Sequence, residues 1–136
     1  MNMDVATIQI KDVNKVYGEN HIVKNLNLDV YQGEFLTLLG PSGCGKTTTL
    51  RMLAGFEEPT DGEVLLNGME ISNIPPYKRD VNTVFQSYAL FPHMTVRENI
   101  GYGLRMKKVK KQEIERRVNE ALQLVQMEEF ADRKPR

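Results

Sequence analysis

Residues 40–48 read Gly-Pro-Ser-Gly-Cys-Gly-Lys-Thr-Thr, and Gly40–Thr47 matches the phosphate-loop pattern G-x-x-x-x-G-K-[ST] at every fixed position. The loop follows an apolar run at Phe35–Leu39 and precedes Lys46–Phe56, where apolar residues recur at helical spacing. The pattern requires this strand–loop–helix order, because the loop and the positive end of the helix bind phosphate together. The stretch therefore predicts a nucleotide-binding protein of the α/β class.

The residue types of the loop suit a triphosphate, which needs many hydrogen-bond donors in a small space. Gly40, Gly43 and Gly45 allow positive φ angles and remove the Cβ atoms that would keep the backbone away from the ligand. Lys46 supplies a positive charge toward the β- and γ-phosphates, and the Thr47 hydroxyl is placed to ligate Mg²⁺. We therefore predict a triphosphate bound with Mg²⁺ as the ligand.

The composition is that of one globular domain of ordinary size. The chain has 136 residues, of which 40% are hydrophobic and 26% are charged, which excludes disordered and collagen-like chains. Its 18 basic and 18 acidic residues leave no net charge, so a sequence-independent nucleic-acid binder is not expected. Basic residues nevertheless gather at Arg105–Arg117. We interpret this segment as a solvated helix face, with a surface for a partner or for lipid as the alternative.

Three features bear on the compartment of the chain. The longest uncharged run, residues 81–96, contains Pro92 and His93 and is too short and too polar to span a membrane. No apolar stretch of signal-peptide length lies at the N-terminus, so secretion is not expected. The single cysteine, Cys44, cannot form an internal disulfide, which fits a reducing compartment. We do not predict a catalytic thiol there, because phosphoryl transfer needs none.

The remaining elements follow from periodicity and turn residues. Alternation and apolar runs predict strands at Ile8–Val13, Ile22–Val30, Phe35–Leu39, Glu63–Leu66 and Val81–Phe85. The runs at Phe35–Leu39 and Val81–Phe85 are typical of strands buried on both faces of a parallel sheet. Turns are expected at 18–20, 32–33 and 67–68, and helices at Lys46–Phe56, Val96–Met106 and Lys110–Met127. Thr95 and Glu98 have the capping-box spacing.

Three stretches carry a resemblance to a known family. They are FLTLLGPSGCGKTTTLRMLAGFE (35–57), VNTVFQSYALFPHMTVRENIGYGLRM (81–106) and FADRKPR (130–136). On these stretches the chain resembles the N-terminal part of the ATP-binding-cassette (ABC) ATPases, and especially the ATP-binding subunits of bacterial spermidine/putrescine importers. The resemblance implies a phosphate-loop core with an N-terminal antiparallel β part over residues 1–93. It also implies the beginning of a helical part over residues 94–136.

The resemblance also assigns roles to single residues. It implies that Tyr17 stacks on adenine and that Gln86 contacts Mg²⁺ and the attacking water, so that Lys46 and Gln86 serve catalysis. Thr47 and Gln86 are the implied metal ligands. The segment Tyr88–Met94 resembles the one that meets the membrane subunit. The implied nucleotide-binding residues are Tyr17, Gly40, Pro41, Ser42, Gly43, Cys44, Gly45, Lys46, Thr47 and Thr48.

The resemblance further implies an assembly. Two ATPase subunits would form a homodimer, bind two permease subunits at the cytoplasmic face of the membrane, and work with an extracytoplasmic polyamine-binding protein. The solute is implied by resemblance alone, because the ATPase does not touch it. ATPase subunits of importers for sugars, sulfate or ferric iron are therefore the alternative.

Several motifs of the family are not found in these residues. No glycine follows Gly103, so the signature LSGGQ is absent, and no Asp is followed by Glu. We therefore expect the chain to be a truncated ABC ATPase that binds nucleotide weakly and does not hydrolyse it alone. A non-catalytic nucleotide-binding fragment is the alternative. A small kinase or GTPase is less well supported, because the base-reading motif Asn-Lys-x-Asp is absent.

Overall fold

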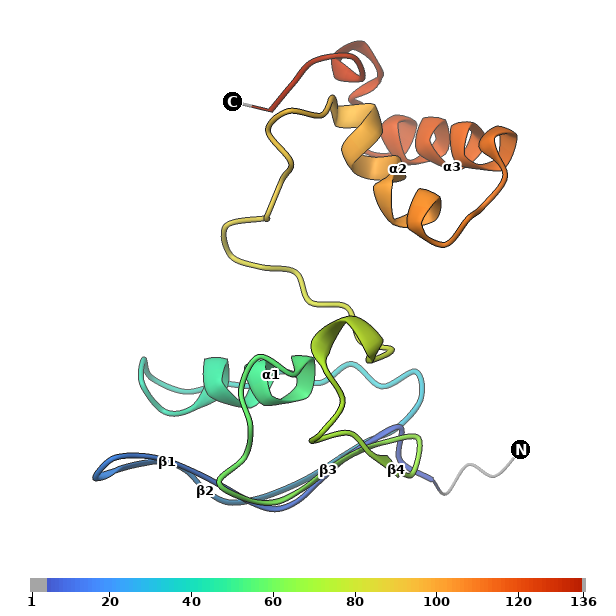
Figure 1. Cartoon of the computed structure of the whole chain (residues 1–136). Coiled ribbons are helices and arrows are strands. Elements are labelled where there is room, and N and C mark those ends of the chain that lie inside the picture. The colour runs from blue at the N-terminus through green and yellow to red at the C-terminus, as the bar shows by residue number, and fades with distance from the viewer. Residues whose placement is uncertain (1–4, 136) are drawn as a thin grey trace. The chain divides into compact units, whose positions relative to one another are not determined.

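The computed structural model describes residues 5–135, which form two compact units. The first unit ends at Thr83 and the second begins at Val84. The first unit holds the strands and α1, and the second holds the longer α2 and α3, as Figure 1 shows.

The first unit is built on an antiparallel sheet with the strand order β2-β1-β3-β4. The strands are β1 (Ile8–Tyr17), β2 (Asn20–Val30), β3 (Asp61–Leu66) and β4 (Met69–Glu70). The turns expected at 18–20 and at Asn67–Gly68 join neighbouring strands and are confirmed. Asn67 and Gly68 have φ angles of 51° and 81°, which suit a tight two-residue hairpin.

The core of this unit lies between one face of the sheet and helix α1 (Lys46–Ala54), which covers that face in Figure 1. Val13, Val23 and Val64 point into it from three strands, and Met52 reaches it from α1. These side chains are buried because the strand alternation places them on one face of the sheet. The core therefore fixes the helix that follows the phosphate loop.

Two predicted strands are wrong. Phe35–Leu39 forms no strand, and its end residues Phe35 and Leu39 are 94% and 87% exposed. Val81–Phe85 also forms no strand, and Val84 is 88% exposed. An apolar run becomes a buried strand only when neighbouring strands supply hydrogen bonds on its edges. Among residues 5–135, no strand pairs with either segment.

The second unit packs α2 (Val96–Met106) against α3 (Lys111–Leu124). Thr95 and Glu98 form the expected capping box: Thr95 N donates to Glu98 Oε2 at 2.7 Å, and Glu98 N donates to Thr95 Oγ1 at 3.2 Å. Helix α3 ends three residues before the predicted Met127, because Gln126 takes a left-handed φ of 56°.

A small core holds the two helices of this unit together. Val118 and Leu122 of α3 are each 1% exposed, and Ala131 packs beside them from the segment after the short turn η2 (Glu128–Phe130). Gly101 allows the helices to approach closely, because a Cβ there would lie 3.2 Å from a methyl group of Ile114. No helix in the described part of the chain is long and apolar enough to cross a membrane.

Candidate nucleotide-binding site

The phosphate loop, defined here as Gly40–Thr48, leads into the N-terminus of α1. Gly45 is the N-cap residue of the helix and has a φ of 93°, and Gly43 has a φ of 81°. A Cβ on Gly45 would lie 3.1 Å from the carbonyl oxygen of Ile22 and 3.1 Å from a methyl group of Val23. Both the left-handed backbone and the close contact with β2 therefore require glycine at position 45.

The N-terminal end of α1 is open to a ligand. No side chain caps it, and its first turn contains no acidic residue. The N–H and the hydroxyl of Thr49 both donate to the carbonyl oxygen of the N-cap residue Gly45, at 2.9 and 2.8 Å. The N–H groups of a first helical turn have no partners within the helix, so those of α1 can bind an anion.

Lys46 brings a cation to the loop. Its ammonium group donates a hydrogen bond to the carbonyl oxygen of Gly40, so the side chain folds back over the loop that precedes it. The hydroxyl-bearing Thr47 is exposed on the first turn of α1. The loop thus carries a fixed positive charge, free N–H groups and an exposed hydroxyl, which together suit a polyphosphate bound with a divalent cation.

Cys44 closes a turn within the loop. Its N–H donates to the carbonyl oxygen of Pro41 at 3.3 Å, which closes a turn over Ser42 and Gly43. A Cβ on Gly40 would lie 2.6 Å from the Cys44 sulfur, so a side chain at position 40 would force the thiol to move. The thiol is free and exposed.

A cavity of about 490 Å³ adjoins the loop on the side of β2. Ile22, Val23 and Leu26 line it from the strand, and Gly43 and Cys44 line it from the loop. Thr49 lines it from the first turn of α1, whereas Lys46 and Thr47 do not contribute to its lining.

Tyr17 lies in the same unit as the loop, at the end of β1, and is 41% exposed. The Lys15 ammonium lies 4.9 Å from the centre of its ring and 3.1 Å from a carboxylate oxygen of Glu57. Hydrogen bonds from Lys15 and, to a lesser degree, from Tyr17 hold the pKa of Glu57 below its ordinary value. Sequence reasoning missed Lys15 and Glu57. Residues two apart on a strand lie on the same face, so the spacing of Lys15 and Tyr17 could have indicated their contact.

Gln86 belongs to the second unit and is exposed in a turn that spans residues 86–89. Tyr88 and Ala89 follow with left-handed φ angles of 60° and 49°, and the N–H of Tyr88 donates to the Phe85 oxygen at 3.0 Å. The loop and Tyr17 thus share one unit, whereas Gln86 belongs to the other.

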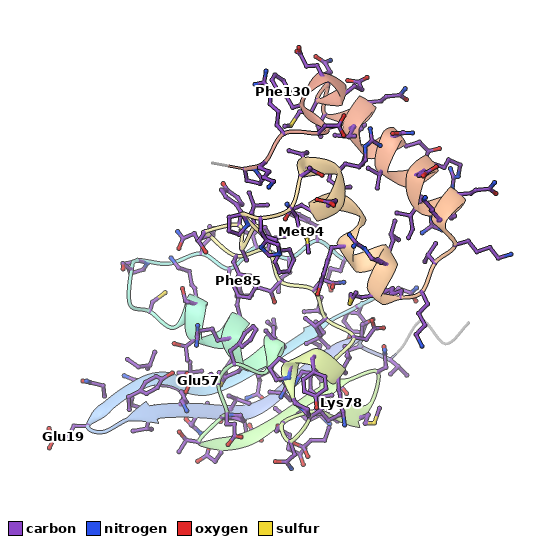
Figure 2. The ribbon with its side chains drawn as sticks, turned by 45° about the horizontal axis from the view of Figure 1, so that its top comes forward. Glu19, Glu57, Lys78, Phe85, Met94 and Phe130 are labelled. Atoms are coloured by element: carbon purple, nitrogen blue, oxygen red, sulfur yellow. The ribbon has the colours of Figure 1, made fainter. Side chains whose placement is uncertain are left out.

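The segment Tyr88–Met94 is attached to α2. The Asn99 side chain accepts a hydrogen bond from the Phe91 N–H at 2.9 Å and donates to the Phe91 carbonyl at 3.1 Å. The centres of the Phe91 and Tyr102 rings lie 4.6 Å apart. Leu90, which precedes Phe91, is 56% exposed. Figure 2 shows Met94 in this segment, just before α2. Sequence reasoning missed Asn99, because nothing in its local pattern distinguishes it from a solvated helix residue.

The residues of the loop fit Mg²⁺ only together with a phosphate ligand. Among residues 5–135, no group of three or more His, Cys, Asp or Glu side chains could hold a metal ion. Mg²⁺ commonly takes one or two protein oxygens and completes its shell with phosphate oxygens and water. The exposed Thr47 hydroxyl beside an anion-binding helix end meets that requirement.

Comparison with known proteins decides the family. A sequence model described as "ABC transporter" matches residues 23–136. The chain belongs to the ABC transporter family. The expected fold class, an α/β phosphate-loop core of the ABC ATPase type with an antiparallel β part and a helical part, is confirmed by the similar solved structures.

Curated relatives of this ABC transporter chain share more than half of its residues. The spermidine/putrescine import ATP-binding protein PotA of Aggregatibacter actinomycetemcomitans is 61% identical over 94% of the chain and 34% of that protein. PotA of Haemophilus influenzae is 59% identical over the same shares, and PotA of Legionella pneumophila is 56% identical over 96% and 36%. The chain therefore spans about a third of the length of these relatives.

Solved ABC cassettes share its fold. The ATP-binding cassette MJ0796 in a dimeric post-hydrolysis state bound to ADP and Pi is 32% identical, with a TM-score of 0.80 over 94% of this chain and 61% of that one. A second dimeric structure of MJ0796, a bacterial ABC transporter cassette, gives a TM-score of 0.81.

Proposed function

We propose that the chain is the nucleotide-binding part of an ATP-binding subunit that energises an ABC importer of spermidine and putrescine. The observation that carries this proposal is the uncapped N-terminus of α1, preceded by the glycine loop and bearing Lys46. Family membership and the ADP and Pi of the similar MJ0796 cassette support ATP as the nucleotide.

The chemistry proposed for the loop is binding and charge neutralisation. The free N–H groups of the first turn of α1 bind phosphate oxygens, and Lys46 exchanges its bond to the Gly40 oxygen for one to the β- and γ-phosphates. Thr47 would hold Mg²⁺, which when bound neutralises negative charge on the phosphate oxygens. Thr48 would donate near the α-phosphate.

The remaining residues of the site are assigned by the resemblance. Tyr17 is proposed to stack on adenine, and its exposed ring at the end of β1 supports that role. Gln86 is proposed to contact Mg²⁺ and the attacking water. Its exposed position in a turn leaves its amide accessible to such ligands.

The proposed assembly contains two copies of the subunit, two permeases and an extracytoplasmic polyamine-binding protein, at the cytoplasmic face of the membrane. The dimeric state of the similar MJ0796 structures supports the pair of copies. The exposed Leu90 and Phe91 in Tyr88–Met94 supply an apolar surface for a permease groove. The names of the PotA relatives support spermidine and putrescine as the solutes.

Isothermal titration of the chain with Mg·ATP tests nucleotide binding directly. We expect the wild-type chain to bind weakly, and Lys46→Ala to abolish binding because the phosphates lose their fixed cation. Lys11→Ala is the matched control, because Lys11 is an exposed lysine on β1 of the same unit. The absence of Mg·ATP binding by the wild-type chain, or unchanged binding by Lys46→Ala, would contradict the proposal.

Hydrolysis and transport are proposed for the complete subunit. We expect residues 1–136 alone to release no phosphate from ATP, because they contain neither the Asp-Glu pair nor the signature motif of the family. Phosphate release by the pure chain that disappears in Lys46→Ala would contradict this expectation. Uptake of labelled spermidine by cells that carry the complete transporter tests the solute, and uptake of a sugar, sulfate or ferric iron instead would favour another importer class.

A further inference from the structure

Arg79 is a buried cation outside the phosphate loop, with only 8% of the residue exposed. Its guanidinium donates to the carbonyl oxygens of Met52 and Leu53 at 2.8 and 3.2 Å. It also donates to those of Ile74 and Ser72 at 2.7 and 3.4 Å. The first two oxygens belong to the last turn of α1, and the other two precede the short turn η1 (Pro76–Lys78). One side chain therefore joins the end of α1 to residues 72–74.

These bonds supply partners for two carbonyl oxygens at the C-terminus of α1. The last four carbonyl oxygens of a helix lack partners within the helix. In α1, the Arg51 oxygen accepts from the N–H of Gly55 at 3.0 Å, whereas the Met52 and Leu53 oxygens accept from Arg79. The cation also lies at the negative end of the helix dipole, where positive charge is favoured.

Apolar packing alone holds α1 over only part of its length. Met52 and Ala54 are buried, but Leu50 is 51% exposed. The segment that Arg79 joins to the helix is better fixed, because Ile71 is 3% exposed in the core and Ile74 packs against that core. Arg79 therefore attaches the end of the helix to an anchored part of the unit.

We propose that Arg79 is a positioning residue for the phosphate loop. Helix α1 has nine residues, so its two ends lie roughly 13 Å apart, and a tilt of about 5° displaces one end by about 1 Å relative to the other. By holding the C-terminal end, Arg79 keeps the N-terminal N–H groups and Lys46 directed at the phosphates. This inference rests on the nucleotide binding proposed above.

Titration of Arg79 variants with Mg·ATP tests the proposal. We expect Arg79→Ala to raise the Kd about tenfold. Arg79→Lys should recover only part of the affinity, because lysine keeps the charge but lacks the planar fork of donors. Leu66→Ala is the control for general loss of stability, since Leu66 packs against the same core from β3. At an equal folded fraction it should leave the Kd unchanged.

Unchanged affinity in Arg79→Ala, or an equal loss in Leu66→Ala, would overturn the positioning role. Amide hydrogen exchange without nucleotide separates this inference from the proposed function. The Thr49 N–H bonds to the Gly45 oxygen at 2.9 Å and reports on the loop end of α1. It should exchange faster in Arg79→Ala, or in Arg79→Lys if the alanine variant does not fold, while the amides of β1 keep their rates. If the wild-type chain binds no Mg·ATP, the proposed nucleotide binding is wrong. The exchange experiment still tests Arg79 in that case, and an unchanged Thr49 exchange rate in the Arg79 variants would overturn its positioning role.

Discussion

The ammonium group of Lys15 lies 3.1 Å from a carboxylate oxygen of Glu57, and so joins β1 to the segment that follows α1. It also donates to the Glu58 carbonyl oxygen at 2.6 Å and lies 4.9 Å from the centre of the Tyr17 ring. Figure 2 shows Glu57 close to α1. Because one face of the Tyr17 ring carries this cation, a nucleobase can stack only on the other face.

Replacing Lys15 by methionine should weaken the binding of the base and spare that of the phosphates. The variant keeps a long unbranched side chain but loses the cation that contacts Glu57 and the ring. We expect the affinity for Mg·ATP to fall about fivefold, which corresponds to roughly 1 kcal/mol of base stacking. The affinity for Mg·tripolyphosphate, which has no base, should not change. Equal losses for both ligands in calorimetry would refute a role confined to the base.

Replacing Gly45 by alanine should abolish nucleotide binding. A Cβ there would lie 3.1 Å from the Ile22 oxygen, on a backbone with a φ of 93° that alanine adopts only with strain. The start of α1 would then move away from β2. Gly103→Ala is the matched control, because its Cβ would meet no atom within 4 Å and lies within α2. That change should leave Mg·ATP binding intact, and binding by Gly45→Ala as tight as by Gly103→Ala would contradict the model of the loop.

Alkylation of Cys44 should compete with nucleotide binding. The thiol is free and exposed, and its sulfur lies close to Gly40 inside the loop. A bulky adduct would occupy space needed by the phosphates, so labelled protein should lose Mg·ATP binding. Bound nucleotide should in turn slow labelling, followed by intact-mass spectrometry. Cys44 is the single cysteine, so Cys44→Ala serves as the unlabelled control. Full labelling without loss of affinity would contradict this prediction.

Acid should destabilise the second unit through Glu113. Hydrogen bonds from Arg116 and Arg117 lower the pKa of Glu113 to about 2. Because the pKa is lower in the folded chain than in the unfolded one, the carboxylate stabilises the fold above its ordinary pKa of 4.5. This contribution is lost as the pH falls through about 2. The free energy of unfolding should therefore fall less between pH 4.5 and about 2 in Glu113→Gln than in the wild-type chain.

Urea unfolding at a series of pH values, followed by helix circular dichroism, measures this effect. Glu115→Gln is the control, because Glu115 is an exposed carboxylate of the same helix. The difference between the two variants should shrink at high salt, since the Glu113 pairs are accessible to solvent. Parallel pH profiles of Glu113→Gln and the wild-type chain would show that these pairs do not contribute.

Local sequence determined most of the elements and the chemistry of the loop. Alternating apolar residues placed β1, β2 and β3, and Asn67–Gly68 placed the hairpin to β4. The capping pair Thr95 and Glu98 placed the start of α2. These features depend on neighbours in the chain, through side-chain alternation, turn geometry and the N–H groups of a first helical turn. The spacing of the phosphate-loop residues is equally local, which is why the pattern alone predicted the ligand class.

Tertiary structure decided which apolar runs are buried and what surrounds the site. Phe35–Leu39 has the composition of an interior strand, yet it is exposed because no strand among residues 5–135 pairs with its edges. Arg79 stands between Lys78 and Asp80 and looks like a surface residue in the sequence, but the fold buries it against the end of α1. Strand pairing and the burial of a charge both depend on groups far apart in the chain, so only the folded structure settles them.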